Sequence, residues 1–198
     1  MIVDPHRVGH ELRYYPGETN VRMADIIIVS KVNTAKPEDI KQVKENVRKI
    51  NPNAKIIESS ITITAEEEDT LTGKKVLVIE DGPTLTHGEM KFGAATIKAK
   101  EKNAEIVDPR PYATGTIKEV YELWPHLGKL LPAVGYSENQ MKELEDTINA
   151  VPCDLVLMGT PTDLRRYLDV DKPVLRVKYE YKELEPGQLI AELEGVLP

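Results

Sequence analysis

The stretch KKVLVIEDGPTLTHGEMKFGAATIKAKEK, Lys74 to Lys102, decides the fold of this chain. It opens with an unbroken apolar run at Val76–Ile79, which predicts a strand buried on both faces, as in parallel sheets. The run ends in Glu80-Asp81-Gly82-Pro83, a turn that puts two carboxylates just past the strand. Small residues at Gly93–Ala95 and at Ala99 then predict a helix packed closely on the sheet. Open α/β sheets bind ligands outside the carboxyl ends of their strands, so this loop is the first candidate site.

The same alternation of apolar strand, polar turn and helix extends to both sides of this stretch. Further strands are predicted at residues 1–3, 26–29, 54–58, 104–107, 155–158 and 174–177. Helices are predicted at 37–50, 116–124, after the capping box at 137–140, and at 187–197. Residues 8–23 are expected to form a long loop or a short helix, and residues 125–136 a loop. Strands that alternate with helices indicate parallel βαβ units, and hence an α/β fold with a mostly parallel sheet.

A polar, acidic segment at residues 65–74 (AEEEDTLTGK) is the best candidate for a domain boundary. It divides the chain into residues 1–72 and a second, Rossmann-like α/β unit at 73–198. One continuous domain over residues 1–198 is the alternative, because a solvated connection has the same composition. The chain also reaches an acidic strand-end turn, Asp4-Pro5, after only a short strand, which suggests a start inside a larger architecture.

Composition excludes several classes of function. The 198 residues include 26 Lys and Arg against 33 Asp and Glu, a net charge of −7, which is unsuited to non-specific binding of nucleic acid. No apolar run approaches the roughly 18 residues needed to span a bilayer, and the first residues do not resemble a signal peptide. The single cysteine, Cys153, favours a buried thiol in a reducing compartment. We therefore expect a cytoplasmic protein, with a composition typical of thermophiles.

The loop after Ile79 carries the side chains of a possible metal or anion site. Carboxylates suit Mg²⁺ or Mn²⁺ better than Zn²⁺ when thiols are absent nearby, and the predicted ligands are Glu80, Asp81, Asp108 and Asp4, with His87 as a further chelator. A phosphate or carboxylate is expected near a helix N-terminus, held by Gly82, Thr84, Thr86, His87, Gly88, Lys91 and Arg110. The alternative is structural: Asp81 and Thr86 cap the turn and the helix, and His87 is exposed to solvent.

A second candidate follows the strand at 26–29. Ser30-Lys31-Val32-Asn33 resembles the base-recognition motif of GTPases, usually Asn-Lys-x-Asp, and Ser59 lies after the next strand, where such folds contact the base. Asn33 lacks the charged acceptor that selects guanine. The sequence contains no G-x-x-x-x-G-K-[ST], so the chain is not expected to hydrolyse nucleotides by itself. Gly159 to Leu164 looks like another base motif, but we interpret it as a strand-to-helix turn with Asp163 near the N-cap.

Several runs together resemble a known family. They are Asp-Pro-His-Arg-x-Gly-His-Glu-Leu (4–12), Tyr-Pro-Gly-Glu (15–18), Glu-Asp-Gly-Pro-Thr-Leu-Thr-His-Gly (80–88), Val-Asp-Pro-Arg-Pro-Tyr-Ala (107–113), Gly-Tyr-Ser-Glu (135–138) and Gly-Thr-Pro-x-Asp-Leu-Arg-Arg (159–166). The whole chain resembles the C-terminal portion of a predicted GTPase family that is often catalogued with cyclic 2,3-diphosphoglycerate synthetases. The resemblance implies a three-layer fold like that of P-loop NTPases, without the P-loop. It also implies GTP or ATP with Mg²⁺ as cofactor in the full-length family.

Two functions follow from these observations. In the first, the chain is part of a nucleotide-dependent phosphotransferase or ligase and binds a small phosphorylated or carboxylated substrate at residues 80–91. In this case a separate P-loop chain is the expected partner, and a homo-oligomer is the alternative assembly. In the second, the chain is a non-enzymatic module that binds an anionic ligand or a protein.

Overall fold

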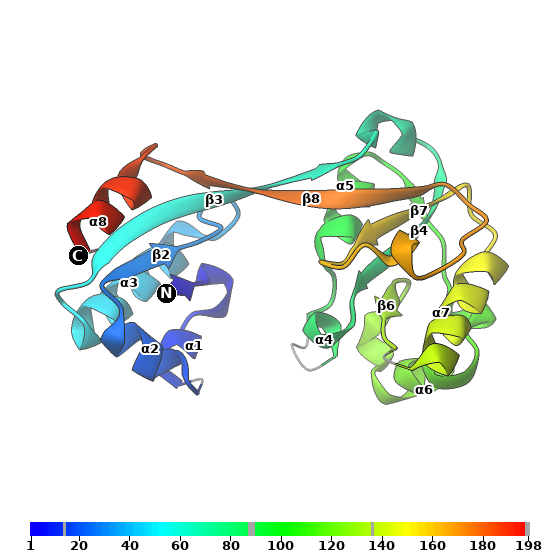
Figure 1. Ribbon diagram of the computed structural model, residues 1–198, viewed down its shortest axis with the longest axis horizontal. Coiled ribbons are helices and arrows are strands. Elements are labelled where there is room, and N and C mark those ends of the chain that lie inside the picture. The colour runs from blue at the N-terminus through cyan, green and yellow to red at the C-terminus, as the bar shows by residue number, and fades with distance from the viewer. Residues whose placement is uncertain (14, 87–89, 136, 197–198) are drawn as a thin grey trace. The chain divides into compact units, whose positions relative to one another are not determined.

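The computed structural model describes residues 1–13, 15–86, 90–135 and 137–196. The chain divides into two compact units (Figure 1). The first unit contains residues 1–62 and 179–198, and the second contains residues 63–178. The chain passes from one unit to the other twice, within strands β3 and β8.

The strands are β1 (Ile2–Val3), β2 (Ile26–Val29), β3 (Lys55–Ala65), β4 (Lys75–Asp81), β5 (Glu105–Ile106), β6 (Leu131–Ala133), β7 (Leu155–Gly159) and β8 (Val174–Glu183). The α-helices are α1 (His10–Arg13), α2 (Gly17–Met23), α3 (Pro37–Ile50), α4 (Gly82–Leu85), α5 (Ala94–Glu101), α6 (Gly115–Leu123), α7 (Glu138–Ala150) and α8 (Gln188–Val196). Short 3₁₀ turns are η1 (Pro5–Arg7), η2 (Glu68–Leu71), η3 (Arg110–Tyr112), η4 (Pro125–Leu127) and η5 (Leu164–Arg166).

The fold is α/β, with a mostly parallel sheet between layers of helices, and this confirms the fold class that the sequence predicts. The strands β1, β2 and β3 run parallel, as do β4 to β7 and the pairing of β7 with β8. The strand β8 runs antiparallel to β3. The backbone amide of Leu184 donates to the Glu58 carbonyl, and the backbone amide of Glu66 donates to the Arg176 carbonyl. Residues near the end of β8 therefore lie beside the start of β3, and residues near the start of β8 lie beside the end of β3.

In the first unit, one face of the sheet packs on helices. Val3, Ile27 and Val29 point to this face and pack with Val21 of α2 and with Val43 and Val47 of α3. The helix α3 has the bounds that the sequence predicts: Pro37 opens it, and its C-terminal cap is Asn51. The Asn51 side-chain amide donates to the carbonyls of Val21 and Ala24, which ties the end of α3 to the end of α2.

In the second unit, β4 lies at the centre and is covered on both faces, as predicted from its unbroken apolar run. Val76 and Val78 pack toward α5, together with Leu155 and Leu157 of β7. Leu77 and Ile79 point the other way and pack on α6 and α7. This alternation makes α5 one outer layer of the unit and the pair α6 and α7 the other.

The predicted boundary at residues 65–74 differs from the division in the structure. This segment contains η2, and Leu71 is fully buried in the core of the second unit. The passage between the units lies earlier, inside β3, whose alternating Ile61-Thr62-Ile63-Thr64 is typical of a strand. Residues 179–198 return to the first unit. The predicted loop at 125–136 contains the short strand β6, and residues 8–23 contain α1 and α2.

Among the helices in the described ranges, none combines the length and the apolar character that crossing a membrane requires.

Candidate functional site

The order of strands in the second unit marks a candidate crevice. From β4 the chain continues to β5 and β6, which both pair with β4 on one side. The helix α7 then returns the chain to β7, which pairs with the other side of β4. In open α/β sheets, ligands bind outside the carboxyl ends of the strands at this point of reversal. The loops after β4 and β7 therefore flank the candidate site.

Glu80, at the end of β4, is buried and faces the start of α5. Its Oε1 accepts hydrogen bonds from the Gly93 amide at 3.1 Å, the Thr96 amide at 2.7 Å and the Thr96 hydroxyl at 2.8 Å. Burial raises the pKa of this carboxyl, although the hydrogen bonds from Thr96, Ala95 and Gly93 act in the opposite direction. The helix N-terminus that would attract a ligand anion is therefore filled by a side chain of the protein.

The ends of β4, β7 and α5 are in close contact around Glu80. A Cβ atom added at Gly159 would lie 2.5 Å from Glu80 Oε2 and 3.0 Å from Ala95 Cβ, so only glycine fits there. This contact closes the site at the depth of Glu80. A ligand at the crevice would lie above this contact, against the loops.

The loop after Glu80 uses two predicted ligands for local hydrogen bonds. Asp81 caps α4, and its Oδ2 accepts from the Thr84 amide at 3.2 Å and the Thr84 hydroxyl at 2.5 Å. The Thr86 hydroxyl donates to the Gly82 carbonyl at 3.0 Å. The capping alternative therefore describes Asp81 and Thr86. His87 and Gly88 lie outside the described residues, and Lys91 is exposed.

The predicted metal ligands do not come together in the described part of the chain, where no group of three His, Cys, Asp or Glu residues could hold a metal ion. Asp108 forms a two-pronged ion pair with Arg110, with Nε–Oδ1 at 2.9 Å and Nη2–Oδ2 at 2.5 Å. This pairing lowers the pKa of Asp108 and occupies the guanidinium that we expected to bind an anion. Asp4 belongs to the first unit and pairs with Lys31. These contacts give Asp81, Asp108 and Asp4 partners within the protein, and the four-carboxylate metal site stays a prediction.

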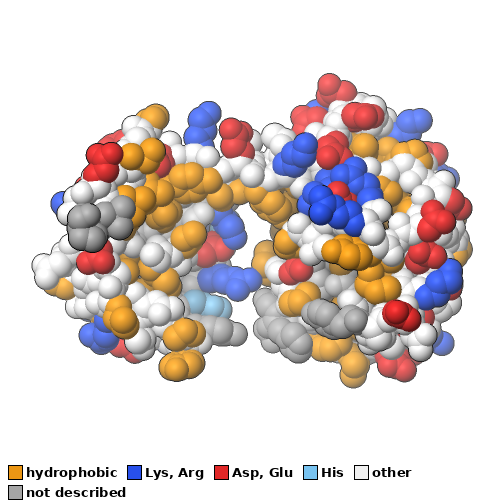
Figure 2. Space-filling view, viewed as in Figure 1, with side chains coloured by type: hydrophobic (Ala, Val, Ile, Leu, Met, Phe, Trp, Pro, Cys, Tyr) orange, Lys and Arg blue, Asp and Glu red, His pale blue; other side chains and the backbone are white. Residues whose placement is uncertain are grey.

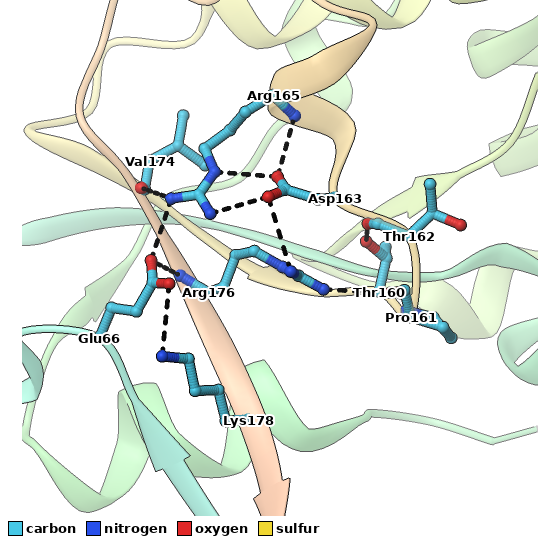
Figure 3. A network of polar contacts seen from close by, with 9 residues as sticks. All are labelled: Glu66, Thr160, Pro161, Thr162, Asp163, Arg165, Val174, Arg176 and Lys178. Carbon is cyan, nitrogen blue, oxygen red and sulfur yellow. Dashed lines mark hydrogen bonds and ion pairs between the residues drawn. The ribbon is translucent and has the colours of Figure 1, made fainter.

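The loop after β7 is held by a network of charges that the sequence did not suggest (Figure 3). Asp163 caps η5, as predicted, and also binds the Arg165 guanidinium at 2.9 and 2.8 Å. Those bonds lower the pKa of Asp163 to about 2. Arg165 also pairs with Glu66 at 3.0 Å, which links the loop after β7 to the segment that follows β3. Arg176 Nη2 donates to the Pro161 carbonyl at 3.0 Å and fixes the same loop from β8.

The rest of this network was missed because its members lie on distant segments. Glu66 also accepts from the Arg176 amide at 3.2 Å and pairs with Lys178 at 3.6 Å. The available signal was the alternation of Arg176 and Lys178 along a strand, which places both cations on one face. The result is a cluster with three cations and two carboxylates beside the loop after β7.

In the first unit, the residues of the predicted base motif contact the protein itself. Lys31 has a left-handed φ of 59° and pairs with Asp4 at 2.6 Å. The Asn33 side-chain amide pairs with the Ile61 backbone in both directions, each at 3.1 Å. Ser30 and Ser59 are buried. The donor and the acceptor of Asn33 both hold the loop to β3, and the contact of Asn33 with a purine stays a prediction.

The first unit also has a pocket of about 360 Å³ lined by Asp4, Arg7, His10, Glu11 and Asn20, among others. Glu11 is buried at its floor, where it accepts from the Gly9 amide at 2.9 Å and the Asn46 amide at 2.6 Å. A wider groove of about 870 Å³ runs between α3 and β3. Both of these pockets lie in the first unit, whereas the candidate site at the ends of β4 and β7 is inferred from the order of the strands.

Comparison with known proteins gives one informative match. No family model matches the chain. The chain is 53% identical over 195 residues to arginine synthetase ArcE of Thermococcus kodakarensis, a ligase. The name cyclic 2,3-diphosphoglycerate synthetase is not confirmed. The match covers 98% of this chain and 44% of the relative, so the chain spans less than half the length of the curated ligase to which it is similar.

Proposed function

We propose that this chain is part of a nucleotide-dependent ligase that forms a C–N bond in the synthesis of arginine or a closely related amino acid. The observation that carries the proposal is the 53% identity to a protein named arginine synthetase, because it extends over 98% of the chain. The aligned region therefore includes the loops after β4 and β7 and the residues that hold them.

The crevice beside β4 and β7 is proposed as the amino-acid site. An amino acid of this kind presents a carboxylate and at least one cationic or ureido group, which require cations and acceptors in fixed positions. The network after β7 pairs its cations with its own carboxylates and holds the loop that borders the proposed site (Figure 3). Lys91 lies two residues before Gly93, which contacts Glu80, and its exposed ammonium is the proposed partner of the substrate carboxylate.

The chain does not fit a magnesium nucleotide by itself. It has no P-loop sequence, its described carboxylates form no group suited to a metal, and Glu80 fills the start of α5. We therefore place the nucleotide phosphates on residues equivalent to the part of arginine synthetase that this chain does not match. The role proposed for this chain is to bind and orient the amino acid.

A reconstitution assay tests the proposal. The chain is co-expressed with the unmatched part of the Thermococcus kodakarensis protein, and arginine formation from ATP, ammonium and a ureido amino acid is followed by mass spectrometry. We expect turnover from the pair and not from the 198-residue chain, and Lys91→Met should raise the KM for the amino acid at least tenfold. Lys118→Met, an exposed lysine on α6, is the matched control and should leave the KM unchanged. A KM that both substitutions leave unchanged would refute the assignment of Lys91.

A phosphorylated acid is the alternative substrate. The runs at 80–88 and 107–113, which resemble the cyclic 2,3-diphosphoglycerate synthetases, favour it. Calorimetric titration of the chain with 2,3-diphosphoglycerate and with L-arginine separates the two substrates. Binding of either ligand without turnover in the reconstituted pair would favour the non-enzymatic module.

A further inference from the structure

The first unit has an open sheet edge at β1. Its order is β1-β2-β3, and among the described residues no strand pairs with the outer edge of β1. The carbonyl of Met1 accepts from the amide of Ile28 on β2, and the carbonyl of Val3 accepts from the amide of Ser30, the residue after β2. Because backbone groups alternate along a strand, the N–H and C=O of Ile2 point outward and are free for a further strand.

An apolar row crosses the sheet and becomes exposed toward that edge. Ile57, Ile28 and Ile2 are aligned by the strand register, and all three point away from the α3 face. Ile57 is fully buried, Ile28 is half-buried, and Ile2 is 63% exposed. A row of isoleucines that ends in an exposed member indicates that the covering layer continues beyond β1.

The helix on this face is also incompletely covered. An ion pair between Lys55 and Glu192 at 3.8 Å places α8 against the start of β3, on the same face as Ile57. Ile190 and Leu193, one helical turn apart on α8, are 63% and 38% exposed. Figure 2 shows hydrophobic side chains gathered over α8 and β3 in the first unit. Exposed apolar groups on the same face of a sheet as its open edge are candidates for an interaction surface.

We propose that the β1 edge, with Ile2, Ile190 and Leu193, is the docking surface for an α/β polypeptide equivalent to the unmatched part of arginine synthetase. The occupant is inferred from length and geometry together. More than half of the relative lies outside the match, and an open parallel edge beside an uncovered apolar layer is what a further βα unit completes. The identity of the occupant rests on the proposed function, but the surface does not.

Co-expression with the unmatched part of the Thermococcus kodakarensis protein tests the surface. We expect a one-to-one complex in which peptides covering 1–4 and 188–194 gain protection from hydrogen exchange, while a peptide covering 116–124 does not. Ile2→Pro removes the outward N–H, and Ile2→Glu puts a charge on the row. Each should weaken the complex at least tenfold. The matched control is Leu123→Glu, a 69% exposed leucine of the second unit, which should leave the affinity unchanged.

The other outcomes bear separately on the proposed surface and on the proposed function. Failure to recover a complex would overturn it, as would a complex that tolerates both Ile2 substitutions or a homodimer that they disrupt. The melting temperature of each variant is measured first. The binding test uses whichever Ile2 variant has the same melting temperature as the unsubstituted chain. An Ile2-dependent complex that makes no arginine would refute the proposed function and leave the surface standing. Arginine synthesis that is insensitive to Ile2→Pro would refute the proposed surface and leave the proposed function standing.

Discussion

Replacing Glu80 by glutamine should destabilise the second unit by an amount that decreases as pH rises. Oε1 of Glu80 accepts from the Gly93 amide and from the Thr96 amide and hydroxyl at the start of α5, and the Ala95 amide is a further donor to this carboxylate. A glutamine keeps one oxygen and turns an NH₂ toward the remaining backbone N–H. A buried donor left without an acceptor costs about 1–3 kcal/mol, and we expect Glu80→Gln to lose that much near pH 4.5.

The pH dependence gives the sharper test. Burial raises the folded-state pKa of Glu80 above its ordinary value of 4.5, so the unfolded chain releases this proton at lower pH than the folded chain. The stability due to Glu80 is complete below pH 4.5 and is lost as pH rises through the folded-state pKa. Glutamine does not titrate. The difference in unfolding free energy between the natural chain and Glu80→Gln should therefore shrink by up to about 1.4 kcal/mol per pH unit, between the unfolded-state and the folded-state pKa of Glu80.

Denaturation in guanidinium, followed by the fluorescence of the single tryptophan, Trp124, measures this in the unit that contains Glu80. Glu143→Gln is the matched control. Glu143 accepts from the Thr116 amide at 2.8 Å at the start of α6, but its pKa is lowered by the bonds from Thr116. The unfolding free energy of the natural chain should exceed that of Glu143→Gln by an amount that grows as pH rises. If the advantage over Glu80→Gln also grows, the hydrogen bonds outweigh burial and our account of Glu80 is wrong.

Five further outcomes are expected. Gly159→Ala should destabilise the second unit by about 1–3 kcal/mol in the same denaturation assay, because its Cβ meets Glu80. Gly195→Ala, in open space on α8, should not destabilise the chain. Asp163→Asn should remove the acid-labile stability that is lost as pH falls from 3.8 toward 2, and unchanged acid unfolding would contradict this. Asn33→Asp should not create a preference for GDP over ADP in calorimetry, since the side chain serves Ile61. The 198-residue chain should release no phosphate from ATP or GTP above a heat-killed control, because it lacks the phosphate loop.

The parts of the fold that could be predicted are those fixed by neighbouring residues. The apolar run Val76–Ile79 specifies a buried strand, and Ser137 with Gln140 forms the predicted capping box at the start of α7. The antiparallel pairing of β3 with β8 could not be predicted in this way. It joins residues more than a hundred positions apart, such as Glu66 and Arg176, and no local pattern encodes a partner.

The candidate site at the carboxyl ends of the strands stays a prediction, but the contacts of several of its charged side chains differ from those that we expected. A strand-end carboxylate has the same sequence signature whether it faces solvent or a helix. Glu80 faces the helix that begins fourteen residues later, and Asn33 reaches a strand beyond the next helix. Whether a polar side chain is free for a ligand depends on such contacts, which periodicity and spacing do not contain.

The double passage of the chain between the units determines the order in which they can be completed during synthesis. Residues 63–178 emerge from the ribosome as an uninterrupted unit, whereas the first unit needs Tyr179–Glu183, which emerge later. The inner unit can therefore fold first. Its own first and last strands are neighbours, since the Glu66 amide donates to the Arg176 carbonyl at 2.9 Å. Folding of the inner unit thus replaces a long flexible loop in the outer one by a short rigid span, which removes most of the entropy of closing that loop.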